Sequence, residues 1–422
     1  MLTSTDLLFS ILRVAIGNER QLPLILSNNE WKEVLSLLQR HALLGIGFVA
    51  IQKLPREQWP PANVTRTLTA YATQIKAKNL ELNEECHEVV RRMNHDGIEA
   101  VVIKGQSNWE HYPEGLREYR CAGDIDLWAK QINDNGIPIA VQQGDAVEYE
   151  YYKGVRGIIE YARLQCRVRE DKSQFKPLYY HVGYHTDKGT EVEMHYRPSF
   201  FCSPIRNMRM QRWFKEQFDV CLQNKCQLGF PVLTSSVNVI YQLVHLYRHI
   251  FEGGIGLRQL MDYYFALRVW HNDVMECKDL QSQGMWSEGL GTPVMSKTEV
   301  MAVIRSFGMA KLAAAVMYVL NEVFAMPAQL SMNDERSRMK DYPWLLCEPN
   351  EKEGKKLLGE IMLGGNFGQY DTRDAALKKG GMMKHGLWKL KRVMRLVRSY
   401  PEEAMWEPVF RVYHLFWRMI YR

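Results

Sequence analysis

The chain has 422 residues, of which 46% are hydrophobic and 24% are charged, and its formal net charge is +6. These fractions are typical of a globular protein and exclude long disordered, collagen-like and disulfide-scaffold chains. The eight cysteines are scattered, no apolar stretch is long enough to cross a bilayer, and the first apolar run lacks the basic start of a signal peptide. We therefore expect a soluble, reduced, cytoplasmic protein.

The first half of the sequence is predicted to change from helices to strands. Residues 5–77 carry apolar side chains at helical spacing, and a further amphipathic helix is predicted over 80–94. Short apolar runs that end in turn residues then indicate strands. The strands are predicted at 98–103, 124–129, 178–185 and 190–196, and the last two form a hairpin around Asp187-Lys188-Gly189.

Beyond Pro198 the pattern becomes helical again. Helices are predicted at 235–251, 257–270, 298–307 and 310–324, with a polar insertion between His271 and Lys297. The sequence thus predicts an α+β fold, in which a small mixed sheet is embedded in a mostly helical protein. Four regions are expected: a helical region (1–78), an α/β core (79–200), a helical domain that forms the other wall of a cleft (201–330), and a C-terminal helical region (331–422).

The C-terminal region carries the positive charge of the chain. Residues 384–422 hold nine basic and three acidic side chains, interleaved with tryptophan and phenylalanine. Such a basic tail could contact a polyanion or an anionic membrane surface. The simpler interpretation, which we favour at this point, is a pair of helices whose cations face water.

The densest group of chemical side chains is Lys104-Gly105 followed by Asp124-Ile125-Asp126. Residues two apart in a strand share a face, so the two aspartates are expected to project together and to gain a cation between them. Oxygen ligands suit Mg²⁺ or Mn²⁺, which also carry substrate phosphates. The hairpin strand offers the third carboxylate: we expect Glu193, while Glu191 shares its face and could take its place.

Cations and a glycine near the aspartates indicate a phosphate site. Gly105 ends a buried strand, where a bare backbone can approach a phosphate closely. Lys104 and Arg120 could neutralise the oxygens of a triphosphate. Arg258, on a later helix, either contacts the nucleotide or pairs with Asp262 at i, i+4 spacing.

The segments IKGQSNWEHYPEGLREYRCAGDIDLW and VEMHYRP resemble a family of uncharacterised nucleotidyltransferases within the DNA polymerase β-like superfamily, which is widespread in bacteria. The segment LVHLYRHIFEGGIGLRQLMDYY is similar to the helical part of that family. The residues that match the family pattern are Lys104, Gly105, Arg120, Asp124, Asp126, Glu193 and His195. Ser107 follows Gly105 by two positions, where the wider superfamily has a serine directly after the glycine.

This resemblance implies a nucleotidyltransferase fold and the transfer of a nucleoside monophosphate from an NTP, with release of pyrophosphate and two bound metal ions. It does not imply an acceptor, which could be a small molecule, a sugar, a protein or an RNA end. His195 is either a positioning residue beside the carboxylates or a structural histidine.

Two other functions stay open at this stage. His181, His185 and His195 alternate onto one face across the hairpin, an arrangement that suits a zinc or iron hydrolase. The chain could also be a catalytically inactive nucleotide-binding regulator, as in a toxin–antitoxin pair. The intact aspartate pair favours an active enzyme over such a regulator.

Overall fold

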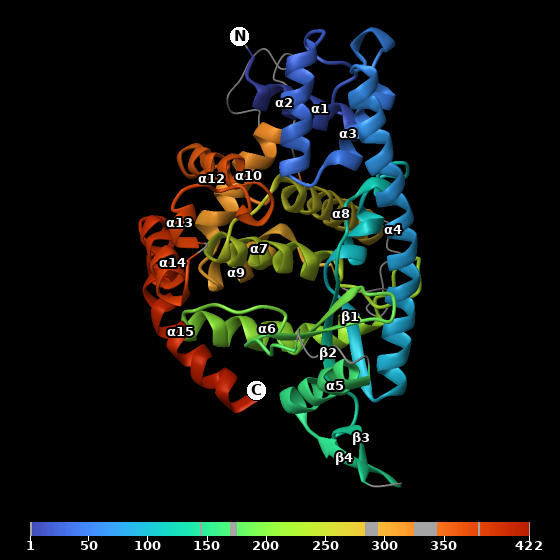
Figure 1. The fold of residues 1–422 in the computed structure, drawn as a ribbon, viewed down its shortest axis with the longest axis vertical. Helices are drawn as coiled ribbons and strands as arrows, with labels where there is room; N and C mark the ends of the chain where they lie inside the picture. The colour runs from blue at the N-terminus through green and yellow to red at the C-terminus, as the bar shows by residue number, and fades with distance from the viewer. Residues whose placement is uncertain are drawn as a thin grey trace. The chain divides into compact units, whose positions relative to one another are not determined.

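The computed structural model describes residues 2–143, 146–168, 175–282, 294–324, 344–378 and 380–421. These residues form a four-stranded mixed sheet, a two-stranded sheet and a large number of helices (Figure 1), so the predicted α+β class is confirmed. The chain folds into two compact units, and each is built from three separate segments. The helical unit comprises Met1–Asn79, His111–Cys121 and Val239–Lys389; the sheet unit comprises Leu80–Glu110, Ala122–Asn238 and Leu390–Arg422.

Nearly all of the helical unit is built from helices that bury one apolar face. In α1, for example, the N-cap Thr3 and Asp6 form a capping box that satisfies the first backbone N–H groups. The helices that lie wholly or largely in this unit are α1 (Ser4–Ile16), α2 (Asn28–Arg40), α3 (Leu44–Lys53), α7 (Ser235–Glu252), α8 (Leu257–Ser282), α9 (Lys297–Ser306), α10 (Ala310–Phe324), α12 (Glu351–Gly364) and α13 (Ala375–Lys378).

Two predicted helices are longer in the structure than in the sequence analysis. The helix predicted over 80–94 is the second half of α4 (Ala62–His95), because residues 71–81 contain no glycine or proline that would end it. The predicted polar insertion after His271 is wrong for its first part, since α8 continues to Ser282. Residues 283–293 of that insertion lie outside the described residues.

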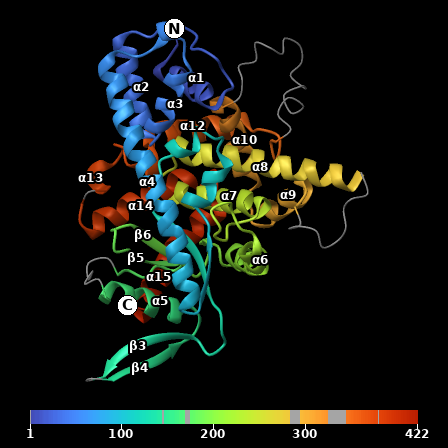
Figure 2. The same cartoon turned by 90° about the vertical axis from the view of Figure 1, so that its right-hand side faces the viewer.

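The sheet unit contains all four predicted strands, in the order β1-β2-β6-β5. The inner strands β2 and β6 are parallel to each other, whereas each outer strand is antiparallel to its neighbour. Four strands form this sheet: β1 (Ile98–Val102), β2 (Ile125–Gln131), β5 (His181–His185) and β6 (Glu191–His195). A second hairpin, β3 (Ile137–Gln143) with β4 (Ala146–Tyr152), was not predicted and extends away from the main sheet in Figure 2.

Alternate residues of the inner strands divide the sheet into an apolar and a polar face. Ile125, Leu127, Val192 and Met194 are fully buried in a core with α4 and α5 (Gly154–Val168). Because side chains alternate along a strand, the residues between them point to the opposite face. That second face carries the charged side chains described below.

The sheet unit also contains α6 (Pro204–Gln223) and α15 (Pro401–Tyr421). Helix α14 (Met382–Leu396) belongs to this unit from Leu390 onward. None of the described helices combines the length and the apolar character needed to cross a membrane.

Candidate active site

The register between β2 and β6 brings two carboxylates together. Asp126 is the direct parallel partner of Glu193, so both side chains leave the sheet on the same face. Asp124 precedes β2 by one residue and shares that face. Each of the three residues offers a carboxylate oxygen, and these oxygens all lie within 4.8 Å of one another. Strand pairing therefore assembles the predicted carboxylate group with Glu193; Glu191, two residues earlier on β6, is not part of it.

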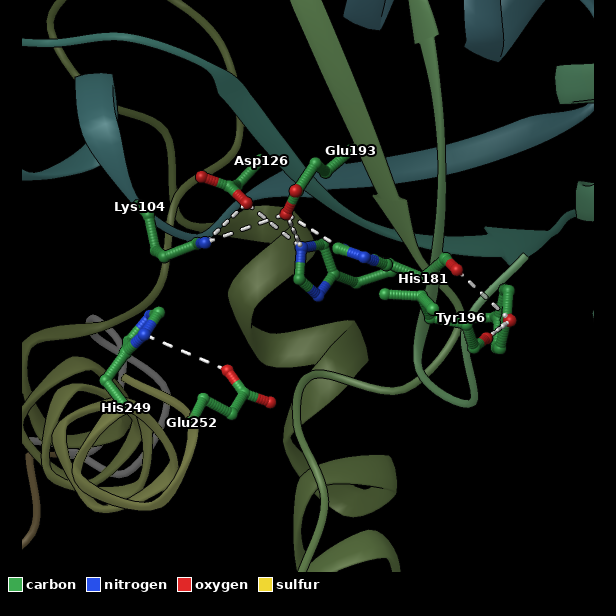
Figure 3. Close-up of polar contacts among 9 residues, drawn as sticks. Lys104, Asp126, His181, Glu193, Tyr196, His249 and Glu252 are labelled. Carbon is green, nitrogen blue, oxygen red and sulfur yellow. Dashed lines mark hydrogen bonds and ion pairs between the residues drawn. The ribbon is translucent and has the colours of Figure 1, made fainter. Parts of the chain in front are cut away.

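Lys104 supplies a cation to these carboxylates (Figure 3). Its Nζ lies 2.6 Å from Oδ1 of Asp126 and 3.9 Å from Oε2 of Glu193. The residue follows β1, whose last residue pairs with Leu127 near the start of β2, and this pairing carries the lysine to the aspartates. A lysine that is only partly exposed here offsets part of the repulsion between the carboxylates.

The glycine after Lys104 has a conformation that other residues adopt only with strain. Gly105 has a φ of +59°, and a Cβ built on it would lie 3.2 Å from the backbone oxygen of Asp124. It begins the 3₁₀ segment η2 (Gly105–His111), in which the Ser107 hydroxyl is buried and has no hydrogen-bond partner among the described residues. The turn thus places the Lys104 ammonium group, a glycine backbone without a side chain and the Ser107 hydroxyl within four consecutive residues.

Two histidines surround Glu193 on the polar face. The Nδ1 atom of His181 lies 2.8 Å from Oε2 of Glu193, and Nε2 of His195 lies 3.3 Å from the same oxygen and 3.0 Å from Oδ1 of Asp126. His181 is opposite His195 in the β5–β6 register, which explains why they meet. His185, the third predicted histidine, is opposite Glu191 instead and is not part of this group.

The start of β5 is held by Tyr196. Its hydroxyl donates to the backbone oxygen of Leu178 and lies 3.3 Å from that of His181 (Figure 3). This contact fixes the backbone from which the His181 side chain reaches Glu193. The histidine pattern of the sequence favoured a competing site for His181, whereas the contact of His181 with Glu193 depends on the strand register, which the pattern does not reveal.

The pKa values of Asp126 and Glu193 are shifted in opposite directions. Burial, together with the neighbouring Asp124 carboxylate, raises the pKa of Asp126 to about 7. Burial would also raise the pKa of Glu193, but the hydrogen bonds from His181 and His195 and the charge of Lys104 lower it well below its usual range. Glu193 is therefore ionised near neutral pH. The Asp126 carboxyl, whose pKa lies near neutral pH, can lose its proton when a cation binds.

His195 is held in a buried position between two carboxylates. Burial would lower its pKa, but its hydrogen bonds with Asp126 and Glu193 outweigh this effect and raise the pKa. In His181, by contrast, burial prevails and lowers the pKa in spite of the Glu193 contact. The two histidines therefore differ in charge over part of the pH range, although both contact Glu193.

Arg120, which was predicted to bind phosphate, forms a buried ion pair in the helical unit. Its Nε and Nη2 donate to the two carboxylate oxygens of Asp262 at 2.6 and 2.8 Å, and the Tyr112 hydroxyl donates to Oδ1 at 2.7 Å. Of the two roles considered for Arg258, the i, i+4 pairing with Asp262 is not formed, and Asp262 pairs with Arg120 instead. Arg258 instead donates from Nη1 to the backbone oxygen of Cys121 at 2.8 Å.

Comparison with known proteins agrees with the resemblance noted from the sequence. A family described as uncharacterised nucleotidyltransferases matches residues 27–284, a range that includes the whole four-stranded sheet and every candidate site residue. No curated protein matches the chain, and neither does any solved structure. Because the match covers more than half of the sequence, the chain belongs to this family of uncharacterised nucleotidyltransferases.

Proposed function

We propose that the protein transfers a nucleoside monophosphate from an NTP to a hydroxyl or amine acceptor and releases pyrophosphate. The observation that carries the proposal is the parallel pairing of Asp126 with Glu193, with Asp124 close to both. Membership in a nucleotidyltransferase family supports the reaction class. The proposal also places the chain in the DNA polymerase β-like superfamily and in a bacterial cytoplasm, where NTPs are available.

The donor set of the carboxylate group fits a hard divalent cation. Asp124, Asp126 and Glu193 present oxygens within 4.8 Å of one another, and oxygen is the ligand that Mg²⁺ and Mn²⁺ prefer. We propose that these three residues hold two such ions. When bound, the ions would lower the pKa of the acceptor group and stabilise the charge on the departing pyrophosphate.

The residues of the turn after β1 would bind the triphosphate. Lys104 would exchange part of its contact with Asp126 for a charge-assisted bond to a phosphate oxygen. Gly105 would let the backbone come close to the phosphates, and the Ser107 hydroxyl would find the acceptor that it lacks among the described residues.

Within the helical unit, Arg120 and Arg258 would bind an anionic group such as a phosphate. The Nη1 atom of Arg120 is buried without a hydrogen-bond partner among the described residues, although Nε and Nη2 are bound to Asp262. The Nε atom of Arg258 is in the same situation. A buried N–H group without an acceptor costs free energy, so these guanidinium groups could donate hydrogen bonds to an anionic ligand.

His195 and His181 would act as positioning residues in this mechanism. By contacting Asp126 and Glu193, His195 restricts the directions in which both carboxylates can point. His181 holds the same Glu193 oxygen from the neighbouring strand. Neither histidine needs to transfer a proton for nucleotidyl transfer.

One observation favours a second candidate function. His181, Glu193 and His195 form a group of potential metal ligands of their own, which is the donor set of many zinc hydrolases. This group shares Glu193 with the carboxylate group, so the two candidate sites would compete for the same side chain. The inactive regulator is the third candidate, and turnover alone distinguishes it from the first.

Pyrophosphate release is the decisive measurement. The purified chain would be incubated with each NTP, Mg²⁺ or Mn²⁺, and a panel of sugar, amine, protein and RNA acceptors. Release that is lost in Asp124→Asn and Asp126→Asn, and kept in the exposed control Asp134→Asn, would support the proposal. Metal-dependent NTP binding without release would favour the regulator. Hydrolysis of another substrate that depends on His181 and consumes no NTP would favour the zinc hydrolase.

A further inference from the structure

The last helix presents an apolar face to solvent along its whole length. Five apolar residues follow the three- and four-residue spacing of one helix face, and each is between 54% and 72% exposed: Met405, Val409, Val412, Phe416 and Met419. Continuous apolar surface of this kind is rare on soluble proteins unless it is an interaction site. Scattered exposed apolar residues would need no such explanation, but here they form one face of α15.

The opposite face of α15 anchors the helix to its own unit. Glu403 is fully buried and accepts hydrogen bonds from the backbone N–H groups of Cys202 and Ser203, at the start of α6. Trp417 is buried in the core of the sheet unit. The helix is therefore held in the fold by a polar and aromatic face, and packing within the unit does not require the apolar one.

Exposed cations lie beside exposed apolar residues in the segment that precedes α15. Leu390 and Met394 are exposed on α14, and so are Lys391 and Arg395 on the same helix and Arg398 just after it. Residues 384–398 contain six basic side chains and no acidic one. Exposed apolar and cationic side chains thus occur together over residues 390–398, directly before the apolar face of α15.

We propose that this surface, defined as residues 390–398 and the exposed face of α15, binds an anionic lipid bilayer. A helix with a wide apolar face lies in the plane of a membrane interface, where its apolar side chains enter the acyl region. Neighbouring lysines and arginines are attracted to anionic headgroups. Residues 390–398 supply the cations of this interaction, and α15 supplies the apolar face.

Charge and side-chain type argue against two other occupants. A second copy of the chain, bound about a two-fold axis, would bring the same cationic residues of both copies close together. Single-stranded RNA stacks its bases on aromatic side chains, whereas four of the five residues that define the exposed face of α15 are aliphatic or thioether residues and only Phe416 is aromatic. An anionic membrane satisfies the apolar face and the cations together.

Vesicle flotation of the full chain tests the proposal. The protein would be mixed with vesicles of phosphatidylcholine alone or with about 30% phosphatidylglycerol, at low and at high salt. We expect flotation with the anionic vesicles, and weaker flotation as salt rises. Val412→Glu should weaken binding at least ~10-fold, because it places a carboxylate in the interface. The matched control Ile205→Glu, at an equally exposed apolar residue of α6, should bind like wild type.

A charge variant tests the electrostatic part separately. Replacing Lys391, Arg395 and Arg398 by glutamine should reduce binding to anionic vesicles by roughly 100-fold, since each cation near the surface contributes a factor of about five. Circular dichroism of all variants would verify that they fold.

The proposal is overturned if the wild-type chain does not bind anionic vesicles better than neutral ones. It is also overturned if Val412→Glu and Ile205→Glu behave alike, or if light scattering shows a dimer that only Val412→Glu dissociates. Pyrophosphate release is measured independently, in the absence of vesicles. A failure to bind lipid therefore leaves the proposed reaction unaffected, and a failure to release pyrophosphate leaves the lipid surface unaffected.

Discussion

Replacing Asp126 by asparagine should stabilise the metal-free protein, and the gain should grow with pH. Asp126 is 1% exposed, and its pKa is raised from 3.8 to about 7 by burial and by the Asp124 carboxylate. A raised pKa means that the folded state holds the proton more tightly than the unfolded state. The stability that this proton contributes is present below pH 3.8 and is lost as the pH rises through about 7. Asparagine carries no proton to lose.

The size of the effect follows from the shift. About three pKa units correspond to about 4 kcal/mol, of which about 3 kcal/mol is lost between about pH 5 and about pH 8. The change of hydrogen-bond geometry in Asp126→Asn is common to both pH values, so the difference between them isolates the ionisation.

Urea denaturation in EDTA, followed by tryptophan fluorescence at the two pH values, measures this difference. We expect the stability of Asp126→Asn relative to wild type to be about 3 kcal/mol greater at the higher pH. The exposed control Asp134→Asn should change stability by less than about 0.5 kcal/mol at either pH. An equal gain for Asp126→Asn at both pH values would refute the reasoning. Mg²⁺ should reverse the effect in wild type, with an affinity that rises with pH because metal and proton compete for Asp126.

Three further predictions concern the third carboxylate, the buried Arg120–Asp262 ion pair and Gly105. Glu193→Gln should slow pyrophosphate release at least ~100-fold, because Glu193 is the direct strand partner of Asp126. Glu191→Gln should retain most of the activity. The reverse ranking would show that Glu191 is the third carboxylate. Asp262→Asn should lower the free energy of unfolding by about 3 kcal/mol, since it leaves the buried Arg120 charge without its partner; an unchanged urea midpoint would contradict this. Gly105→Ala should cost about 1 kcal/mol in the same assay because of its positive φ, and a stability equal to wild type would rule out that strain.

The sequence by itself determined most of the local structure of the site. The apolar runs at Ile98–Val102 and Ile125–Gln131 form strands, as their composition predicts. The alternation of Asp124, Ile125 and Asp126 was enough to place both aspartates on one face and the isoleucine in the core. These features depend on residues that are close together in the chain, and local periodicity therefore reveals them.

Sequence patterns were less informative where an element had no clear boundary. Helix α4 runs from Ala62 to His95 and joins the helix predicted over 80–94 to the helical region before it, because intrinsic helix propensity does not require an apolar face at every turn. The hairpin of β3 and β4 was missed, although Ile137, Ile139 and Val141 alternate as in a strand. A short alternating run is a weak signal when its partner strand is not recognised.

Only the tertiary structure decided which residues meet. Glu193 rather than Glu191 lies beside Asp126 because β2 and β6 pair in parallel, and a shift of one residue would move every side chain to the other face. Arg120 pairs with Asp262 across 142 positions of sequence, whereas the local i, i+4 pattern favoured Arg258 as the partner. Local sequence sets the conformation of a segment, but the pairing of distant segments depends on how the whole chain buries its apolar surface and satisfies its buried charges.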